Sequence, residues 1–588
     1  MSARAHRLTW GAVAAAGLVG VGAMLRLANL HWPPLSDAEA VLALGAAQGT
    51  LEGSPFADVM PGALGLSAAY HVATRLAFDM VGAGDGLARL LPALAGCLMV
   101  LLPLGLRDRI GRAPALAAML TLAFSPSMIA ASRTVSGLTL AVLGLGGWFL
   151  LGLASPSTDT GGRSLVLGGL CAGLGLLAGP AAVSGVLGLA GGLLLARALW
   201  GPMALAGASL RSLAPRQIGI ALAVGAALAA GFGLYPVGLS GVFDSLGVWI
   251  RGWVEPGGLP PLGALAALMV HDPFTLVFGF WGALILLRRG DPLGRLFVSW
   301  ALGTLVVAMV YPARQAADLA WVCLPLSLLA GVALVDIGQR LVTSWSWSGH
   351  ALLVAGLLLL AVFGYYQLTG YAMGSSPGVL GSQPGLGVVF LVVVLGLAVL
   401  MIALFGVGWS ARAAADSAGC ALAILLWLSS IATTWELSLG SRAAGAGTLW
   451  RGQASTPGMR MLVDTLEQIS QAHTGRTDAL PIAVGADLPS GAAWALRRFP
   501  RSIPLDPNPA PEVYLASAQA VPSGMGAEYL GQVIQTGEHW GWMGILPPLE
   551  LLSGRDGDLL TLPERWVVLV RTDIATLGAV SEGLPTVP

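Results

Sequence analysis

Two carboxylates near the N-terminus have the spacing best suited to chemistry. Asp37 and Glu39 are separated by one residue, within an acidic stretch (residues 31–61) that contains no arginine. A carboxylate beside a membrane can act as a general base that takes a proton from an acceptor hydroxyl. The sequence Ser36-Asp37-Ala38-Glu39 is equally typical of a helix N-terminus, with Ser36 or Asp37 as the N-cap. Catalysis and helix capping are therefore both open interpretations of this pair.

A divalent cation is also compatible with these acids, because carboxylate oxygens are typical ligands of such ions. Two carboxylates alone specify a metal only weakly, and the sequence contains neither HExxH nor CxxC. The sequence therefore predicts no metal-ligand set and requires no cofactor, while a divalent cation beside the acids stays an open alternative.

The elements that position these residues are membrane helices. Of the 588 residues, 56% are hydrophobic and only 10% are charged, and the mean hydropathy is +0.78. Soluble domains carry about 25% charged residues. The composition therefore predicts a polytopic α-helical membrane protein, and the formal net charge of zero implies no nucleic-acid partner.

Thirteen stretches have the roughly 20 apolar residues that a membrane-spanning helix needs. They are residues 8–30, 86–106, 113–131, 134–154, 164–180, 181–199, 217–236, 271–288, 295–312, 319–336, 350–368, 386–408 and 415–435. Residues 61–82 are apolar too, but they carry His71, Arg75 and Asp79 and are expected to lie along the outer interface.

The positive-inside trend favours this count. With thirteen spans, the arginine-bearing turns 107–112, 197–216 and 288–295 all fall on the side of the N-terminus. The sequence thus predicts a multi-pass protein of the cell (plasma) membrane, with a cytoplasmic N-terminus and an extracytoplasmic C-terminal part.

This topology gathers polar residues on the outer side. Arginines there run against the trend, so they either pair with nearby acids or bind the phosphate of an anionic lipid. We predict a donor-phosphate role for Arg75, Arg133 and Arg314. Further substrate-loop residues are expected on the same side, namely Asp58, Asp244, Arg251, Asp272 and Asp318.

The composition changes near residue 441. Residues 441–588 contain no 20-residue apolar run, and the segments 481–488, 512–517 and 565–573 are typical of strands. Residues 459–471 predict an amphipathic helix with Met461, Leu462, Leu466 and Ile469 on one face. We therefore expect a transmembrane domain over 1–440, with 31–85 as the first extracytoplasmic loop carrying juxtamembrane helices, and a soluble extracytoplasmic α/β domain over 441–588.

An ordered set of motifs in the first third of the chain resembles the GT-C membrane glycosyltransferases of family 39. That group includes protein O-mannosyltransferases and lipid A aminoarabinose transferases. The matching segments are RLANL (26–30), PLSDAEA (34–40), GAGDGLARLLPALAG (82–96), RDRIGR (107–112), ALAAMLTLAFSPSMIAASR (115–133) and the later YPARQAADLAWVCLPLSLLAG (311–331).

The resemblance implies transfer of a sugar from a polyprenyl-phosphate donor in the membrane to a hydroxyl of a protein or lipid acceptor on the extracytoplasmic side. It also implies a catalytic role for the first-loop acids, here Asp37 and Glu39. In the family the two acids are adjacent, whereas Ala38 separates them here. An alternative is therefore a non-catalytic subunit on the same scaffold that binds lipid or partner proteins.

Overall fold

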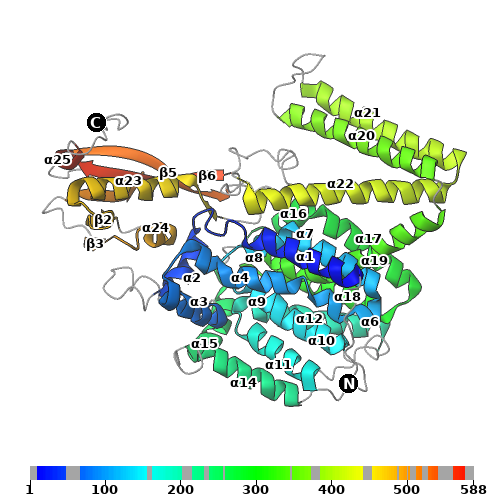
Figure 1. Ribbon diagram of the computed structural model, residues 1–588, viewed down its shortest axis with the longest axis horizontal. Coiled ribbons are helices and arrows are strands. Elements are labelled where there is room, and N and C mark those ends of the chain that lie inside the picture. Colours follow the sequence, from blue (N-terminus) through cyan, green and yellow to red (C-terminus); the bar gives the residue numbers. More distant parts are fainter. Residues whose placement is uncertain are drawn as a thin grey trace.

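The computed structural model has a helical body and a smaller sheet domain (Figure 1). It describes residues 10–47, 67–154, 162–201, 215–230, 238–255, 259–344, 347–372, 384–440, 453–485, 489–499, 501–502, 511–519, 528–540 and 561–575. The helical body ends at Leu439, and the first strand begins at Gln453. Asp58 lies outside the described residues.

Eight helical segments in the described part are long and apolar enough to cross a membrane. They are α1 (Trp10–Leu27), the consecutive helices α4 (Asp85–Met99), α5 (Leu102–Gly105) and α6 (Arg107–Ile110), α12 (Pro180–Trp200), α18 (Pro292–Val310), α19 (Ala320–Ser344) with the preceding turn η5 (Ala316–Leu319), α20 (Trp347–Ala372), α21 (Pro384–Gly408) and α22 (Ala411–Leu439). The chain is thus a multi-span membrane protein.

Two bent helix pairs raise the number of spans to ten at most. The expected thirteen is not confirmed, because three predicted spans correspond to shorter apolar helices. These are Leu138–Ala154 (α9, a π-helical segment and α10), Val166–Leu176 within α11 (Gly162–Leu176) and Ile218–Ala229 within α14 (Pro215–Ala229). Hydropathy located these segments, but the helices are shorter than about 20 residues.

Proline and a capping side chain define each bend. α7 (Arg112–Phe124) and α8 (Pro126–Ser132) meet at Ser125 with a 58° bend. α16 (Pro261–His271) and α17 (Pro273–Arg289) meet at Asp272 with a 94° bend. Proline cannot donate a helical hydrogen bond, so a new helix begins at each one.

The region treated as a loop between two spans, residues 237–270, contains two helices. α15 (Gly238–Arg251) and α16 occupy most of its described residues. α15 is amphipathic, with one polar and one apolar face. It therefore lacks the continuous apolar run that indicates a membrane span.

Glycine allows the membrane helices to pack closely. A Cβ atom on Gly279 of α17 would lie 2.9 Å from the side chain of Leu326 on α19, and one on Gly303 of α18 would overlap the backbone of Gly192 on α12. Small residues at such contacts are a general device of helix packing in lipid. They explain part of the high glycine content.

Two short helices lie at the end of the body nearest the sheet domain, which we call the loop end. They are α2 (Asp37–Ala47) and α3 (Ala68–Val81), and α3 has only 14 residues. The opposite end holds α6 (Arg107–Ile110) and the turn between α17 and α18, and we call it the arginine end. Figure 1 shows the two ends on opposite sides of the body.

The sheet domain contains a six-stranded mixed sheet in the order β1-β5-β6-β4-β2-β3. The strands are β1 (Gln453–Ser455), β2 (Ile482–Val484), β3 (Arg501–Ser502), β4 (Val513–Ser517), β5 (Tyr529–Trp540) and β6 (Thr561–Arg571). β2 is parallel to β3 and β4, whereas β6 is antiparallel to β4 and β5. Helices α23 (Pro457–Thr474), α24 (Ser490–Ala495) and α25 (Thr572–Ala575) complete it.

The sequence located β2, β4, β6 and α23 but missed β5. It also misplaced one core residue of α23. The buried face consists of Met459, Leu462, Leu466 and Ile469, whereas Met461 is 50% exposed. The spacing of three, four and three residues from Met459 follows the helical period, and Met461 falls one position off that stripe.

Candidate functional site

The acidic motif begins α2. The backbone N–H of Ser36 donates to Glu39 Oε2 over 3.1 Å, and the carbonyl of Ser36 accepts the first helical hydrogen bond from Ala40. In a capping box, the acidic side chain of the third helical residue accepts a hydrogen bond from the backbone N–H of the N-cap residue. Glu39 and Ser36 form this half of the motif. The interpretation of Ser36 to Glu39 as a helix N-terminus therefore describes the local structure correctly.

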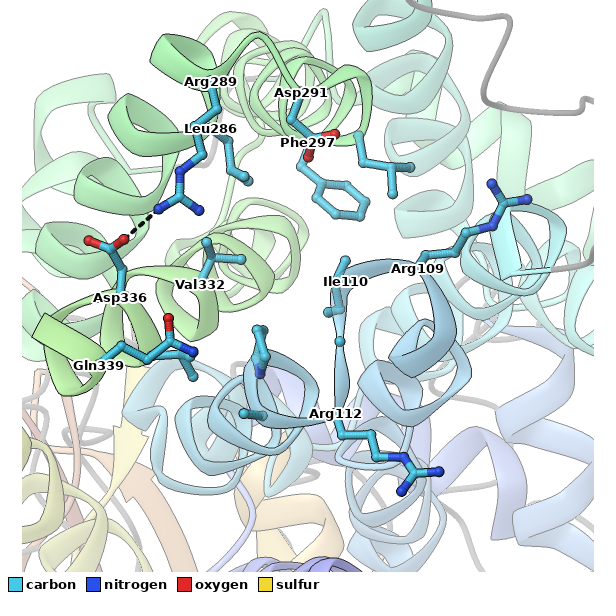
Figure 2. A pocket seen from close by; sticks show the side chains of 15 residues that line it. Arg109, Ile110, Arg112, Leu286, Arg289, Asp291, Phe297, Val332, Asp336 and Gln339 are labelled. Carbon is cyan, nitrogen blue, oxygen red and sulfur yellow. Dashed lines mark hydrogen bonds and ion pairs between the residues drawn. The ribbon is translucent and has the colours of Figure 1, made fainter. Parts of the chain in front are cut away.

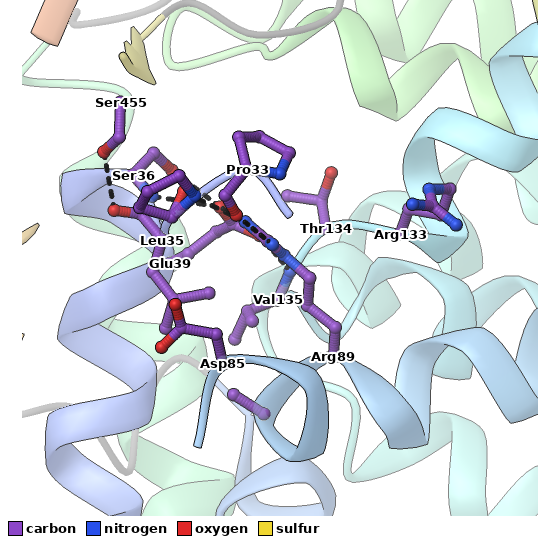
Figure 3. A network of polar contacts seen from close by, with 12 residues as sticks. Pro33, Leu35, Ser36, Glu39, Asp85, Arg89, Arg133, Thr134, Val135 and Ser455 are labelled. Atoms are coloured by element: carbon purple, nitrogen blue, oxygen red, sulfur yellow. Dashed lines mark hydrogen bonds and ion pairs between the residues drawn. The ribbon is translucent and has the colours of Figure 1, made fainter. Parts of the chain in front are cut away.

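Glu39 is enclosed by donors from three segments (Figure 3). Arg89 of α4 donates from Nε and Nη2 over 2.8 and 2.7 Å. Ser36 donates from N and Oγ, and the N–H of Val135 donates over 3.0 Å. Glu39 and Arg89 are 2% and 1% exposed. A carboxylate has about four lone-pair sites, so this one has none left for a substrate proton.

Arg89 extends the same network to the chain that follows α1. Its Nη1 donates to the carbonyls of Leu30 and Pro33 over 3.1 and 2.5 Å, and its Nη2 also donates to the carbonyl of Pro34 over 3.3 Å. The guanidinium thus holds residues 30–39 against α4. A buried charge pair satisfied in this way positions backbone, because moving any partner leaves an unpaired charge.

Asp37 lies in a different environment, although it is only two residues from Glu39. Its side chain is half-buried, and Oδ1 accepts a hydrogen bond of 2.7 Å from the backbone N–H of Gly491 in α24. The acid therefore lies where the helical body meets the sheet domain. Of the two predicted catalytic acids, Asp37 is the one on an accessible boundary.

Several other contacts join the sheet domain to the loop end. Trp494 of α24 donates from Nε1 to Asp85 Oδ1 over 2.6 Å, and Arg497 donates to the carbonyl of Ala83 over 3.0 Å. The Arg497 guanidinium also lies over the Trp494 ring, 4.0 Å from its centroid. Burial lowers the pKa of Arg497 to about 10, with Asp85 acting in the opposite direction.

Two more contacts come from the start of the sheet domain. Ser455 Oγ donates to the carbonyl of Leu35 over 2.7 Å, and Arg460 lies over the ring of Trp32 at 5.5 Å. Sequence analysis assigned no role to Trp494, Arg497 or Ser455. No local pattern could reveal them, because their partners lie more than 400 residues away in the chain.

Arg133 serves the backbone in this structure. Its Nη1 donates to the carbonyls of Leu25, Arg26 and Ala28, and its Nη2 donates to those of Asn29 and Ser438. Carbonyls at the C-terminal end of a helix lack intrahelical donors, and a buried guanidinium can donate to them. Its positive charge also interacts favourably with the negative end of the helix dipole. Arg133 thereby ties the end of α1 to the end of α22.

Arg75 and Arg314, the other predicted phosphate ligands, lie on separate elements. Arg314 is 8% exposed, and its Nη1 donates to the carbonyl of Leu259 over 2.6 Å. Arg75 is half-buried on α3. Burial, with Arg75 nearby, lowers the pKa of His71 to about 4. The three predicted arginines therefore lie on three different segments of the chain.

Asp272 is the most enclosed of the predicted substrate-loop residues. It is fully buried and accepts hydrogen bonds from Ser125 Oγ, from Ser127 Oγ over 2.7 Å and from the N–H of Thr275 over 3.4 Å. It thus joins the α7–α8 bend to the α16–α17 bend. This is a structural arrangement that the sequence did not predict.

The remaining substrate-loop residues are more accessible. Asp318 is half-buried and caps its own turn, because its side chain accepts a hydrogen bond of 2.9 Å from the backbone N–H of Gln315. Asp244 and Arg251 are exposed on α15. Among the described residues, no group of three or more His, Cys, Asp or Glu side chains is placed to hold a metal ion. The substrate roles and the divalent cation stay predictions.

No protein-family model and no curated protein matches the sequence. Among solved structures, ArnT from Cupriavidus metallidurans bound to undecaprenyl phosphate is similar, with a TM-score of 0.56 and 16% identity over 97% of this chain and 99% of ArnT. The structure of ArnT from the same organism in the apo state is similar too, with a TM-score of 0.55 and 17% identity over 97% of this chain and 99% of ArnT. The chain has a GT-C fold. The resemblance found in the sequence is thereby confirmed at the level of the fold.

The GT-C fold accounts for both parts of the molecule, because the aligned region includes the helical body and the sheet domain. An oligosaccharyltransferase from Archaeoglobus fulgidus aligns with a TM-score of 0.44 and 14% identity over 84% of this chain and 64% of its own.

Proposed function

We propose that this protein is a membrane glycosyltransferase that moves a sugar from a polyprenyl-phosphate donor to a hydroxyl of a protein or lipid acceptor. The observation that carries the proposal is the GT-C fold, shared over nearly the whole length with ArnT, one structure of which is bound to undecaprenyl phosphate. The first-loop acids at the loop end provide the chemistry. We place this end on the extracytoplasmic side, because the arginine-bearing turns lie at the other end.

In the proposed reaction Asp37 acts as general base. It takes the proton of the acceptor hydroxyl, whose oxygen attacks the anomeric carbon of the sugar. The bond from that carbon to the donor phosphate breaks, and polyprenyl phosphate leaves with the electron pair. Asp37 suits this role because it is a half-buried carboxylate at the boundary between the helical body and the sheet domain, where its Oδ1 accepts from the Gly491 N–H.

Glu39 acts as a positioning residue in this proposal. Its oxygens are occupied by Arg89, Ser36 and Val135, so it holds the start of α2 rather than a substrate proton. In this proposal Glu39 fixes the start of α2, and Asp37, which projects from the same helix, accepts the proton.

Stabilising the leaving phosphate requires positive charge. Arg314 is the best candidate, because one carbonyl, that of Leu259, accepts from its Nη1, and its buried Nε has no hydrogen-bond partner among the described residues. Arg75 is a second candidate on α3. Arg133 is the weakest, since both of its Nη atoms already serve carbonyls. A divalent cation is the alternative, and loss of transfer in a chelator would reveal it.

The test is transfer by Asp37→Asn, measured with a polyprenyl-phosphate sugar and a mixture of membrane acceptors. Loss of a general base typically costs about 10²-fold or more in rate, and we expect a loss of this size with normal folding. Asp108→Asn, an exposed acid at the arginine end, is the matched control. Transfer at the wild-type rate by Asp37→Asn contradicts the assignment.

A second candidate function is a non-catalytic subunit on the GT-C scaffold. The observation in its favour is that both acids already have intramolecular partners, Glu39 fully and Asp37 through Gly491. Such a subunit should co-purify with a partner protein and show no transfer in any variant. Transfer by the purified wild-type protein alone excludes it.

A further inference from the structure

A cavity of about 430 Å³ lies at the arginine end, far from the acidic motif (Figure 2). It is bounded by the turn between α6 and α7, the end of α17, the start of α18 and the second half of α19. Its volume falls in the roughly 300–1,000 Å³ range of small-molecule sites. Nothing in the proposed transfer reaction uses it.

One wall of the cavity is an ionic network. Arg289 Nη2 lies 2.5 Å from Asp336 Oδ1, and Arg340 Nη2 lies 2.6 Å from Asp336 Oδ2. Asp336 is therefore neutralised by two arginines. Figure 2 shows Gln339 beside this pair, so the wall combines a guanidinium with an amide.

The opposite wall carries positive charge that no acidic side chain of the described residues neutralises. Arg109 and Arg112 border the cavity with exposed side chains, and neither has a side-chain partner among the residues that the structure describes. Figure 2 shows both side chains across from Arg289 and Asp336, with their guanidinium groups directed outward from the middle of the cavity. Arginine side chains are long, so unpaired guanidinium groups can turn over the mouth to meet an anion.

Two helices also begin at the cavity. α7 starts at Arg112 behind Gly111, which has no side chain to cap it, and α18 starts behind Asp291. The N-terminus of a helix carries partial positive charge and free N–H groups. The dipole of α7 therefore adds to the charge of Arg109 and Arg112 on the same wall.

Part of the cavity lining is apolar. Leu286, Phe297 and Val332 line it, and Figure 2 shows the Phe297 ring directed into the middle. Arginines beside a partly apolar lining, at the end of membrane helices, match an anion that is attached to a hydrocarbon. They match a free inorganic anion less well.

We propose that this cavity binds a phosphate group, held by Arg109, Arg112 and the start of α7. The apolar part of the lining, formed by Leu286, Phe297 and Val332, favours a lipid headgroup over a soluble phosphate ester as its source. The proposal does not depend on glycosyl transfer, because no residue of the acidic motif takes part.

The test is calorimetric titration of the full-length protein in uncharged detergent with three probes. They are dihexanoyl phosphatidic acid, glycerol 3-phosphate and inorganic phosphate. We expect the double variant Arg109→Gln/Arg112→Gln to bind the phosphatidic acid roughly tenfold more weakly or worse than wild type, since each charged hydrogen bond is worth about an order of magnitude. Tighter binding of the lipid than of the two soluble probes identifies a headgroup, and equal binding identifies a soluble phosphate.

Arg107→Gln is the matched control, because Arg107 is exposed on the same short helix, lies near Asp108 and does not line the cavity. Val335→Phe fills the cavity without changing charge and should also weaken binding. No binding of any probe to wild type, or unchanged binding by the double variant, overturns the proposal. Weaker binding by the double variant with normal binding by Val335→Phe also overturns it, because the phosphate would then lie on the surface outside the cavity.

Discussion

The two ends of the helical body hold their charges in opposite ways. At the loop end, Glu39 and Arg89 are almost completely buried, and their polar atoms are occupied by each other and by backbone groups. At the arginine end, the Arg289 side chain is 57% exposed although it pairs with Asp336, and Arg109 and Arg112 have no side-chain partner in the described part of the chain.

This difference separates charges that build the protein from charges that are available to a ligand. The Glu39–Arg89 pair, the most conspicuous feature of the acidic region, fixes backbone. The arginine turn 107–112, which in the sequence indicated topology and formed part of the motif set, borders a cavity and keeps unpaired donors. The Glu39–Arg89 pair is thus structural, whereas the arginine turn keeps binding capacity.

The comparison predicts its largest effect for Arg89→Met. Removing one partner of a buried charge pair leaves the other uncompensated, which costs about 3–5 kcal/mol. We expect a strongly lowered Tm and loss of monodisperse protein in detergent. Arg107→Met, at an exposed position, is the control. An unchanged Tm for Arg89→Met contradicts the view that this pair holds the loop end together.

Acid should weaken the loop end through His71. Burial lowers its pKa to about 4, against about 6.5 in an unfolded chain. The folded state therefore keeps His71 neutral. The contribution of neutral His71 to the free energy of unfolding is present above about pH 6.5 and is lost as the pH falls from about 6.5 through 4. We expect a loss of roughly 2 kcal/mol between pH 7 and pH 5. His71→Asn should flatten the dependence of Tm on pH in this range, and an unchanged slope contradicts the prediction.

A smaller effect is expected for the contact between the two domains. Trp494→Phe keeps the aromatic ring but removes the N–H that donates to Asp85. Losing this hydrogen bond to a charged acceptor should cost about 1.5 kcal/mol. Amide hydrogen exchange should then rise in α24 and α2, while Trp566→Phe, inside the sheet, should leave α2 unchanged. Exchange that stays at the wild-type rate in both helices contradicts a role for this contact.

The smallest effect is expected for Arg289→Gln at the arginine end. Its guanidinium is largely exposed, and Arg340 still neutralises Asp336. Exposed ion pairs are worth up to about 1 kcal/mol, so the Tm should change by only a degree or two. A loss as large as that of Arg89→Met would remove the contrast between the two ends.

Local patterns in the sequence were enough for the fold class and for the start of α2. The apolar runs located the membrane helices, the motif set indicated the GT-C fold, and Ser36 to Glu39 signalled a helix N-terminus. Helix length was less predictable, since apolar sequence continues past the point at which a helix ends or bends. The twelve-residue strand β5 was missed entirely.

Long-range contacts explain most of what the sequence did not reveal about the site. Asp37 meets Gly491, 454 positions along the chain, and Arg133 meets the carbonyl of Ser438. An arginine expected to bind phosphate and an arginine that satisfies carbonyls look the same in sequence. Only the fold decides between them, because it determines which acceptors lie within reach.

The central claim is that the protein binds a polyprenyl-phosphate donor at the loop end. Mass spectrometry of lipids that co-purify in mild detergent tests it most directly, with wild type, Arg314→Ala and the control Arg107→Ala. The account predicts a polyprenyl-phosphate species, with or without its sugar, in wild type and Arg107→Ala, and its loss in Arg314→Ala. Ordinary phospholipids alone in all three samples, even after polyprenyl phosphate is added before purification, would contradict it.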